Sequence, residues 1–278
     1  MSVLYKYCDQ KGIAGILELL ELKLPYISEV NDPLECLPFF DCPDDKAAMK
    51  EQWLRTFSRN NISPPVNWEQ ILNEHYKKGE IQKELVESSL ECQKNINKKS
   101  CLLSVSKTAR NTVMWAHYAD KHKGAIIGID FDKVFFEIKR VICGLKLNQV
   151  EYSEQRPKIN ILTDFMEPPQ ALLKTTLTKS IEWKYEREIR TVFLVDTLEN
   201  LQKHGLASLK DFNSRKTWFL RLNPESIREI VFGLYTEESL KLAIRKLIER
   251  AELQHIQLYQ AKESETYTLD LIDIDTKA

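Results

Sequence analysis

The first forty residues combine short apolar stretches with polar turns, a pattern typical of a compact strand–helix–strand unit. Residues 3–7 are mostly apolar and aromatic and predict a strand, and Asp9 can cap a following helix through its carboxylate. A second short strand is expected over residues 22–27, followed by a turn at Asn31-Asp32-Pro33 and an end to the unit near Phe40. The helix between the strands is predicted by apolar residues at helical spacing: Ile13, Ile16, Leu17 and Leu20.

Between residues 43 and 99 the pattern changes to long polar helices. One helix is predicted over residues 44–57 and a second from 68 to about 94, separated by a break at Ser63-Pro64-Pro65. We interpret residues 43–99 as a helical insertion into a single α+β domain that spans residues 1–278.

The remaining chain mixes strands and helices without strict alternation. The run 124–131 is almost continuously apolar, which predicts a strand that is buried on both faces. The mixture favours an α+β fold with a mixed, largely antiparallel sheet. Strands are predicted over 101–106, 124–131, 146–152, 185–195, 218–222, 227–232 and 255–259, and helices over 114–119, from 167 or 169 to about 180, and over 237–250.

Composition narrows the class of protein further. With 43% hydrophobic and 29% charged residues, the chain can bury a sizeable core. Its formal charge of −1 lacks the overall basic character of a nucleic-acid-binding domain. The six cysteines form no Cys-x-x-Cys pair, and no stretch has the length and apolar character of a membrane span or signal peptide. We therefore expect reduced thiols, no membrane association and a cytoplasmic location.

The strongest candidate for chemistry is the segment 183–190, where Glu186 and Glu188 run directly into an apolar strand. If the segment is one strand, its two-residue period places both carboxylates on one face. Two converging carboxylates at the mouth of a cleft can perturb each other's ionisation. The alternative is an exposed strand whose arginines make ordinary ion pairs. The predicted face consists of Glu186, Glu188, Arg190, Val192 and Leu194.

Two other predicted strands carry polar residues that can contact a ligand. Ser104 and Ser106 share one face of the strand 101–106, where two hydroxyls can hydrogen-bond a sugar or an amide. In the first strand Lys6 lies on the face opposite Tyr5 and Tyr7 and can hold a phosphate. Solvent-facing serines and a surface lysine are the alternative interpretation.

Aromatic residues and histidines gather just before the predicted buried strand 124–131. On a helix, Trp115 and Tyr118 lie on one stripe that either packs into the core or stacks on a ligand. His117 and His122 are five residues apart, which is not the spacing of a helical metal pair, so no metal site is predicted. His117 is instead expected to make a structural hydrogen bond.

Several common signatures are absent from the sequence. It has no GxGxxG, Walker-type loop, GxSxG elbow or HExxH motif. The usual nucleotide-binding, hydrolase and zinc-protease interpretations therefore lack support.

The motifs together resemble an uncharacterised bacterial family of unknown function. The resemblance spans most of the chain and implies a link to antiphage defence or mobile elements. It is carried by Leu4-Tyr5-Lys6-Tyr7, Asn31-Asp32-Pro33-Leu34-Glu35, the run 114–120 with Lys123-Gly124 and Ile129-Asp130-Phe131, the segment 183–190, and Ile230-Val231-Phe232-Gly233.

A second resemblance is to ADP-ribosyltransferases, in which a basic residue, a serine-rich strand and a Glu-x-Glu strand follow in order. Lys6, Ser104-Val105-Ser106 and Glu186-Arg187-Glu188 occur in that order here, although Lys6 replaces the usual Arg or His. The resemblance implies NAD as the substrate and a protein or nucleic acid as a possible acceptor.

It also implies roles for the candidate residues. Glu188 would stabilise positive charge on the ribose, and Glu186 would orient or deprotonate the acceptor. Ser104 and Lys6 would hold ribose and phosphate, while Tyr118 or Trp115 would stack on the nicotinamide ring. The full set of expected ligand-binding residues is Lys6, Tyr5, Ser104, Ser106, Trp115, His117, Tyr118 and Arg190.

Two other classes of function stay open. A non-catalytic sensor or partner-binding module would use Trp183 and Tyr185 as structural anchors. A metal-dependent nuclease would combine Glu182 with an upstream acid such as Glu151 or Asp130, since divalent ions need clustered carboxylates.

Overall fold

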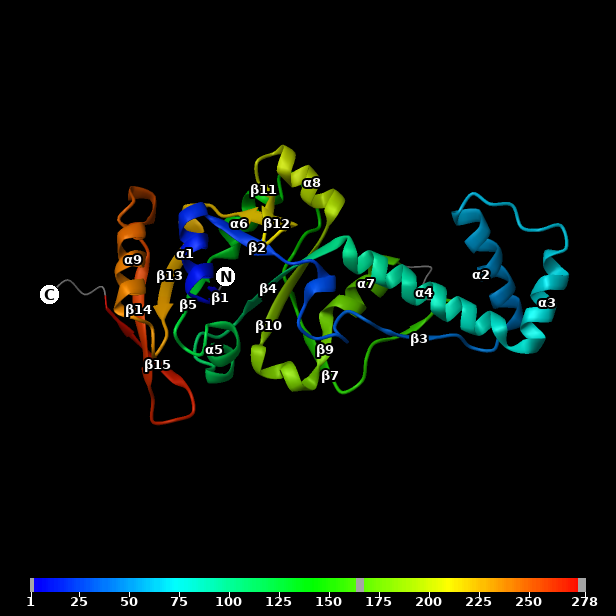
Figure 1. Cartoon of the computed structure of the whole chain (residues 1–278), viewed down its shortest axis with the longest axis horizontal. Coiled ribbons are helices and arrows are strands. Elements are labelled where there is room, and N and C mark those ends of the chain that lie inside the picture. The colour runs from blue at the N-terminus through cyan, green and yellow to red at the C-terminus, as the bar shows by residue number, and fades with distance from the viewer. Residues whose placement is uncertain (1–2, 164–167, 275–278) are drawn as a thin grey trace. The chain divides into compact units, whose positions relative to one another are not determined.

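The computed structural model describes residues 3–163 and 168–274 and has the predicted α+β fold (Figure 1). The chain divides into two compact units, each with its own apolar core. Unit 1 consists of Met1–Glu29, Ser100–Val150 and Glu182–Ala278, and unit 2 of Val30–Lys99 and Glu151–Ile181. The predicted insertion 43–99 falls within unit 2, which also contains residues 30–42 and 151–181.

Unit 1 is built around an eight-stranded sheet, in the order β15-β14-β13-β5-β1-β4-β10-β6. Neighbouring strands are antiparallel except β13 and β14, which are parallel, so the sheet is mixed and largely antiparallel as predicted. Its strands are β1 (Leu4–Cys8), β4 (Ser100–Ser106), β5 (Ala125–Ile129), β6 (Asn148–Gln149), β10 (Glu188–Leu194), β13 (Ile227–Phe232), β14 (Gln257–Glu263) and β15 (Leu269–Asp273).

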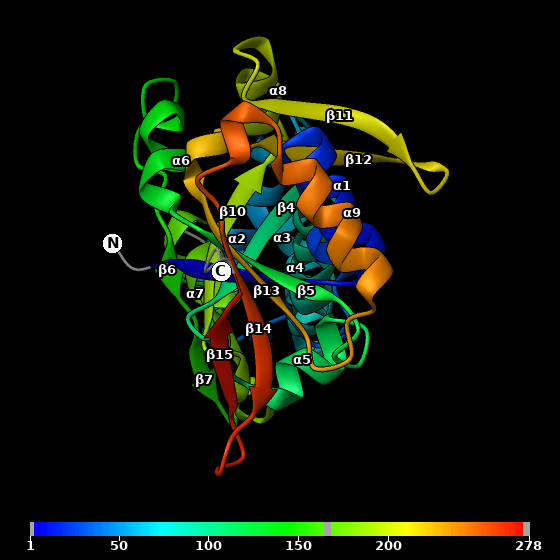
Figure 2. The ribbon, with the colours of Figure 1, turned by 90° about the vertical axis from the view of Figure 1, so that its left-hand side faces the viewer.

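Helices cover both faces of this sheet. On one face α1 (Gln10–Leu19), α6 (Phe131–Ile138) and α9 (Glu238–Ile248) share a core with Leu4 and Ile127, and α1 lies beside α9 (Figure 2). On the other face α5 (Thr112–Tyr118) packs against Tyr7 and Ile126. Every residue of β5 is buried, which confirms the prediction of a strand covered on both sides.

The N-terminal unit of the sequence folds as its pattern indicates. The Asp9 carboxylate accepts a hydrogen bond from the Gly12 N–H at 2.6 Å and caps α1. The strand that follows, β2 (Glu21–Leu24), joins a separate three-stranded sheet with β11 (Ala207–Phe212) and β12 (Arg215–Arg221). Helix α8 (Val195–Lys203) precedes β11, and short 3₁₀ helices cover Ile27–Glu29, Ile181–Glu186, Pro224–Ser226 and Ala251–Leu253.

Unit 2 is mainly helical, with α2, α3 and α4 packed against one another (Figure 1). Its core contains Phe40, Met49, Leu72 and Ile159. Two short parallel strand pairs, β3 with β8 and β7 with β9, complete it. The elements are β3 (Phe39–Asp41), α2 (Lys46–Arg59), α3 (Trp68–Lys78), α4 (Glu80–Lys98), β7 (Glu151–Ser153), β8 (Lys158–Asn160), α7 (Pro168–Leu177) and β9 (Thr178–Ser180).

Several predicted elements need correction. The helix expected from residue 68 to about 94 is two helices, because Gly79 takes a left-handed φ of 70° that ends α3. The strand expected over 185–195 begins only at Glu188 and is followed at once by α8. The helix predicted from residue 167 or 169 is α7, and position 167 lies outside the described residues.

The Asn31-Asp32-Pro33 turn is confirmed, since the Asp32 carboxylate accepts a hydrogen bond from the Leu34 N–H at 2.9 Å. Within the described ranges no helix has both the length and the apolar character needed to cross a membrane.

Candidate functional site

The sheet of unit 1 opens between β1 and β4. In the described part of the chain these strands pair at one position, Tyr5 with Ser106, whereas β1 pairs with β5 along its whole length. Further along β4, Leu102 N–H donates instead to the Pro25 carbonyl at 2.9 Å. In the gap, the Lys6 ammonium donates to the Ser104 carbonyl at 2.9 Å. The Lys6 side chain thus supplies the hydrogen bond to the Ser104 carbonyl that a backbone N–H of β1 would supply if the two strands paired continuously.

Two of the predicted residues form a buried ion pair on β10. Arg190 donates through Nε to Glu188 Oε1 at 2.6 Å and through an Nη to Oε2 at 2.8 Å. Glu188 is 5% exposed and Arg190 1% exposed. Both oxygens of Glu188 are therefore held by one guanidinium fork, which is the strong bidentate geometry of such pairs. Glu188 and Arg190 share a strand face, as predicted, opposite Ser106 and Ser104 of β4.

Glu186 does not lie on this strand, so the prediction of a Glu186, Glu188 and Arg190 face is wrong for Glu186. It ends the 3₁₀ helix Ile181–Glu186, and Arg187 takes a left-handed φ of 46° before β10 begins. The hydroxyl of Ser106 donates to the Glu186 carbonyl at 2.6 Å, and Lys107 N–H donates to the Arg187 carbonyl at 3.2 Å. These two hydrogen bonds from the end of β4 therefore fix the turn at Arg187 and, with it, the position of Glu186.

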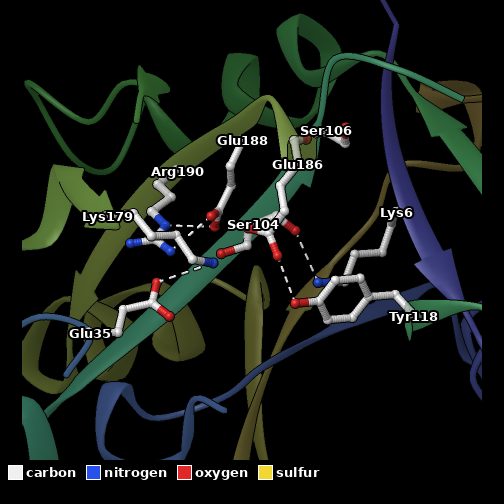
Figure 3. Close-up of polar contacts among 9 residues, drawn as sticks. All are labelled: Lys6, Glu35, Ser104, Ser106, Tyr118, Lys179, Glu186, Glu188 and Arg190. Carbon is white, nitrogen blue, oxygen red and sulfur yellow. Dashed lines mark hydrogen bonds and ion pairs between the residues drawn. The ribbon is translucent and has the colours of Figure 1, made fainter. Parts of the chain in front are cut away.

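The Glu186 carboxylate meets residues from two other elements (Figure 3). The Tyr118 hydroxyl, at the end of α5, donates to Glu186 Oε1 at 2.7 Å. Lys6 of β1 points toward the same place (Figure 3). Burial lowers the pKa of Lys6, an effect opposed by Cys8 and by the charges of Glu188 and Glu186. Glu186 itself is only 4% exposed, so this carboxylate sits in a dry polar cluster.

An aromatic row leads from this cluster toward the surface. His117 lies 6.1 Å from Tyr118 and 6.0 Å from Tyr185 between ring centroids, and Trp183 lies 6.1 Å from Tyr185. The Tyr185 hydroxyl is 3.2 Å from His117 Nδ1, the structural hydrogen bond expected of this histidine. We call Trp183, Tyr185, His117 and Tyr118 the aromatic row; His117 is exposed and the other three are partly exposed.

Trp115 has a different role from the one the resemblance implies. Its side chain is 0% exposed, its Nε1 donates to the Ala109 carbonyl at 2.8 Å, and it packs between Tyr7 and His122. A tryptophan without accessible surface cannot stack on a ligand. The expectation of ligand contact is therefore corrected, and Trp115 belongs to the core.

The structure brings Lys6, Tyr118 and Glu186 together and places the Glu188–Arg190 pair beside Ser104 and Ser106 (Figure 3). Tyr5 lies on the sheet face of Ser106 and Glu188, opposite to Lys6, and hydrogen-bonds Glu229, a residue that no sequence motif indicated. A usable signal was Gly128 in an otherwise apolar strand, because a strand glycine often marks close approach of another group.

The three acidic residues of the nuclease interpretation belong to different elements, two in unit 1 and one in unit 2. Asp130 caps α6 through a 3.2 Å hydrogen bond from Asp132 N–H, and Glu182 is exposed in unit 1. Glu151 is exposed on β7 of unit 2. Among the described residues, no three or more His, Cys, Asp or Glu side chains are grouped so that they could hold a metal ion.

Fold and site together define an α+β protein with a buried carboxylate, lysine and tyrosine cluster at an opening in its main sheet. Residues 114–191 match a family model described as a protein of unknown function, DUF2971. The matched segment runs from α5 to β10 and includes both Tyr118 and Glu186. No curated protein and no solved structure matches the chain.

Proposed function

We propose that this protein cleaves the glycosidic bond between nicotinamide and ribose in NAD, with Glu186 as the catalytic carboxylate. The observation that carries the proposal is the meeting of Glu186, Tyr118 and Lys6 where β1 and β4 part. The order of Lys6, Ser104-Val105-Ser106 and Glu186-Arg187-Glu188, which resembles ADP-ribosyltransferases, supports the same reaction.

The reaction needs a carboxylate in a dry setting. When the C1′–N1 bond breaks, its electron pair leaves with nicotinamide and the ribose develops oxocarbenium-like positive charge. A preorganised carboxylate stabilises that charge far more strongly when water is excluded. Glu186 is nearly fully buried, and Tyr118 fixes one of its oxygens. The Tyr118 hydrogen bond and the Ser106 contact to the Glu186 backbone act as positioning interactions.

Glu186 suits this role better than Glu188, to which the resemblance assigns it. Both oxygens of Glu188 are bound by Arg190, so a ribose hydroxyl would have to displace a buried bidentate ion pair. Glu186 Oε1 accepts a hydrogen bond from the Tyr118 hydroxyl at 2.7 Å. In our proposal Glu188 and Arg190 form the rigid support on which the Glu186 turn rests.

Residues around the cluster fit the rest of the substrate. The aromatic row offers ring surfaces for the planar nicotinamide, and the partly exposed Tyr118 is its member closest to the carboxylate. Arg187 and Lys107 are exposed cations whose backbones are joined by a hydrogen bond, and they can contact the diphosphate. Lys6 donates to Ser104, so we assign it to positioning the cluster rather than to phosphate binding.

The second half of the reaction depends on the acceptor. Water gives ADP-ribose, nicotinamide and a proton, whereas a nucleophilic group of a protein or nucleic acid gives an ADP-ribosylated product. In either case the acceptor loses a proton as it bonds to C1′, and in our proposal Glu186 takes that proton.

The test is nicotinamide release from NAD by the full chain, followed by chromatography, with and without candidate protein and nucleic-acid acceptors. We expect Glu186→Gln to lower the rate by about 10²-fold to 10⁴-fold, the usual loss for a positioned acid or base. Glu182→Gln is the matched control, because Glu182 is an exposed carboxylate on the same 3₁₀ helix. Absence of release and of any NAD binding signal in the wild type would remove the proposal.

A non-catalytic binding module is the second candidate, and the burial of both carboxylates favours it. Glu186 and Glu188 are each at most 5% exposed, as in structural polar clusters. In that case the aromatic row would contact the partner, with Trp183 and Tyr185 as anchors. NAD binding without nicotinamide release, at a Kd unchanged by Glu186→Gln, would select this candidate.

A further inference from the structure

A second recessed site lies on the same sheet face, away from Glu186. One row of residues crosses the strands in register: Glu229 on β13, Gly128 on β5, Tyr5 on β1, Ser106 on β4 and Glu188 on β10. Glu229 and Glu188 are four strand spacings of about 4.8 Å apart, or roughly 19 Å. The residues that line the site at the Glu229 end include neither Glu186 nor Tyr118.

Gly128 lies beneath the Glu229 side chain at this site. A Cβ atom added to Gly128 would lie 2.6 Å from Glu229 Cγ and 2.7 Å from Val3 Cγ1. The Glu229 side chain therefore lies across the bare backbone of Gly128, and Tyr5 stands on its other side. A pocket of about 380 Å³ opens there, within the range of small-molecule sites. Six of its lining residues are polar: Tyr5, Tyr259, Glu229, Thr108, Lys107 and Arg110.

The Glu229 carboxylate is held in place by Tyr5. Tyr5 donates its hydroxyl to Glu229, and burial together with the Glu229 charge raises the pKa of Tyr5, so the phenol stays protonated as a donor. A carboxylate only accepts hydrogen bonds, and its two oxygens favour a ligand edge with two adjacent donors. Glu229 therefore favours a ligand group with adjacent N–H donors.

The other side of the pocket is cationic. Lys107 and Arg110 line it and are exposed, but the Lys107 ammonium donates to Gln149 Oε1 of β6 at 2.7 Å, so Arg110 is the cation that faces a ligand. Arg110 lies 3.5 Å from Asp270, but both side chains are about half exposed, so this pair is weak and can open to a ligand. An anionic ligand group is favoured there, because guanidinium and ammonium groups are the usual partners of phosphate.

We propose that this pocket binds a guanine nucleotide. The N1–H and exocyclic amino group of guanine donate to Glu229, the ring lies against the tyrosines Tyr5 and Tyr259, and the phosphate contacts Arg110. Adenine presents an acceptor at N1 beside its amino group, and that lone pair would face the carboxylate. A site built for hydrogen bonds rejects the ligand that leaves its groups unpaired, so guanine is preferred over adenine.

The experiment is isothermal titration calorimetry of the full chain with GMP, AMP, guanosine and inorganic phosphate, in the absence of NAD. We expect GMP to bind at least about tenfold more tightly than AMP, since one unmatched buried hydrogen bond costs that much or more. This wild-type comparison needs no variant, and it is independent of NAD cleavage.

Variants locate the site. Glu229→Gln should remove the preference for GMP over AMP. Arg110→Ala should weaken GMP binding several-fold and leave the affinity for guanosine unchanged. Lys262→Ala is the matched control, because Lys262 is an exposed cation of β14 on the face opposite Tyr259 and should change nothing.

A chain that gives no GMP signal, or that binds GMP and AMP equally, overturns the assignment. So does a Glu229→Gln protein that keeps the wild-type circular dichroism spectrum and the wild-type preference. If Glu229→Gln does not fold, Tyr259→Leu replaces it, and unchanged GMP affinity in that variant also overturns the proposal.

Discussion

Glu186 and Glu188 stand two residues apart and are equally buried, yet their surroundings differ. The region of Glu188 is one strand, where Arg190 binds both carboxylate oxygens across a spacing of two residues. The region of Glu186 joins three distant segments, with Tyr118 from α5, Ser106 from β4 and Lys6 from β1. Burial alone therefore does not separate the carboxylate that we propose to be catalytic from the one that we propose to be structural. We propose that the partners of each carboxylate make the distinction, and the following substitutions test it.

Loss of Glu188 should have the largest effect on stability. Glu188→Gln leaves the Arg190 charge buried without its partner, and we expect the free energy of unfolding to fall by about 3–5 kcal/mol. Urea denaturation measures the change. The double variant Glu188→Leu with Arg190→Met should recover most of it, because apolar replacement of a whole buried pair is often neutral. A Glu188→Gln protein as stable as the wild type would show that the Glu188–Arg190 ion pair does not stabilise the fold.

Tyr118→Phe should lower the free energy of unfolding less than Glu188→Gln does, and it should also slow nicotinamide release. It removes one hydrogen bond to a charged group, worth about 1.5–3 kcal/mol in unfolding free energy. It also releases the Glu186 oxygen that the phenol fixes, so nicotinamide release should slow. Tyr267→Phe serves as the control, since Tyr267 is fully exposed. Unchanged rate and stability in Tyr118→Phe would mean that the contact to Glu186 does not matter.

Lys6→Met tests the opening between β1 and β4. It leaves the part-buried Ser104 carbonyl without the ammonium donor, and we expect the free energy of unfolding to fall by about 1 kcal/mol, the usual net contribution of one hydrogen bond. Lys11→Met, at an exposed position of α1, should leave the urea midpoint unchanged. If Lys6→Met instead weakens NAD binding and leaves stability intact, the lysine contacts the substrate and its assignment to positioning is wrong.

The smallest effect is expected at His122, which packs against Trp115 of the helix that carries Tyr118. Burial lowers its pKa below the ordinary 6.5, so the unfolded chain binds this proton more readily than the folded one. Unfolding free energy should then fall as pH drops below 6.5. His122→Gln should flatten this dependence in urea titrations above and below that pH, and the exposed control His204→Gln should not. An unaltered pH dependence in His122→Gln contradicts the account.

Much of the fold was predictable because the apolar pattern repeats at strand or helix spacing. The cap at Asp9, the buried strand β5 and the βαβ order of β13, α9 and β14 follow from local residues. Helix α8 was missed because Leu194 and Val195 continue the apolar run of β10, so the pattern shows no boundary there. Gly79 could have signalled the break between α3 and α4.

The sequence indicated which segment carries the candidate site, but it did not indicate how the side chains of that segment are arranged. The sequence singles out the segment 183–190 by its charged residues, but the left-handed turn at Arg187 has no signature in its residue type. That one turn removes Glu186 from the face of Glu188 and gives it Tyr118 as a partner. The guanidinium fork on Glu188 likewise depends on a rotamer that period-two geometry does not specify.

The most direct test of the central claim compares nicotinamide release by two variants that both fold. We predict that Glu186→Gln loses about 10²-fold or more of the wild-type rate, whereas the Glu188→Leu, Arg190→Met double variant stays within about tenfold of it. Circular dichroism and urea midpoints measured in parallel keep stability apart from chemistry. A folded double variant without activity, beside a Glu186→Gln protein that still releases nicotinamide, would contradict the assignment and return catalysis to Glu188.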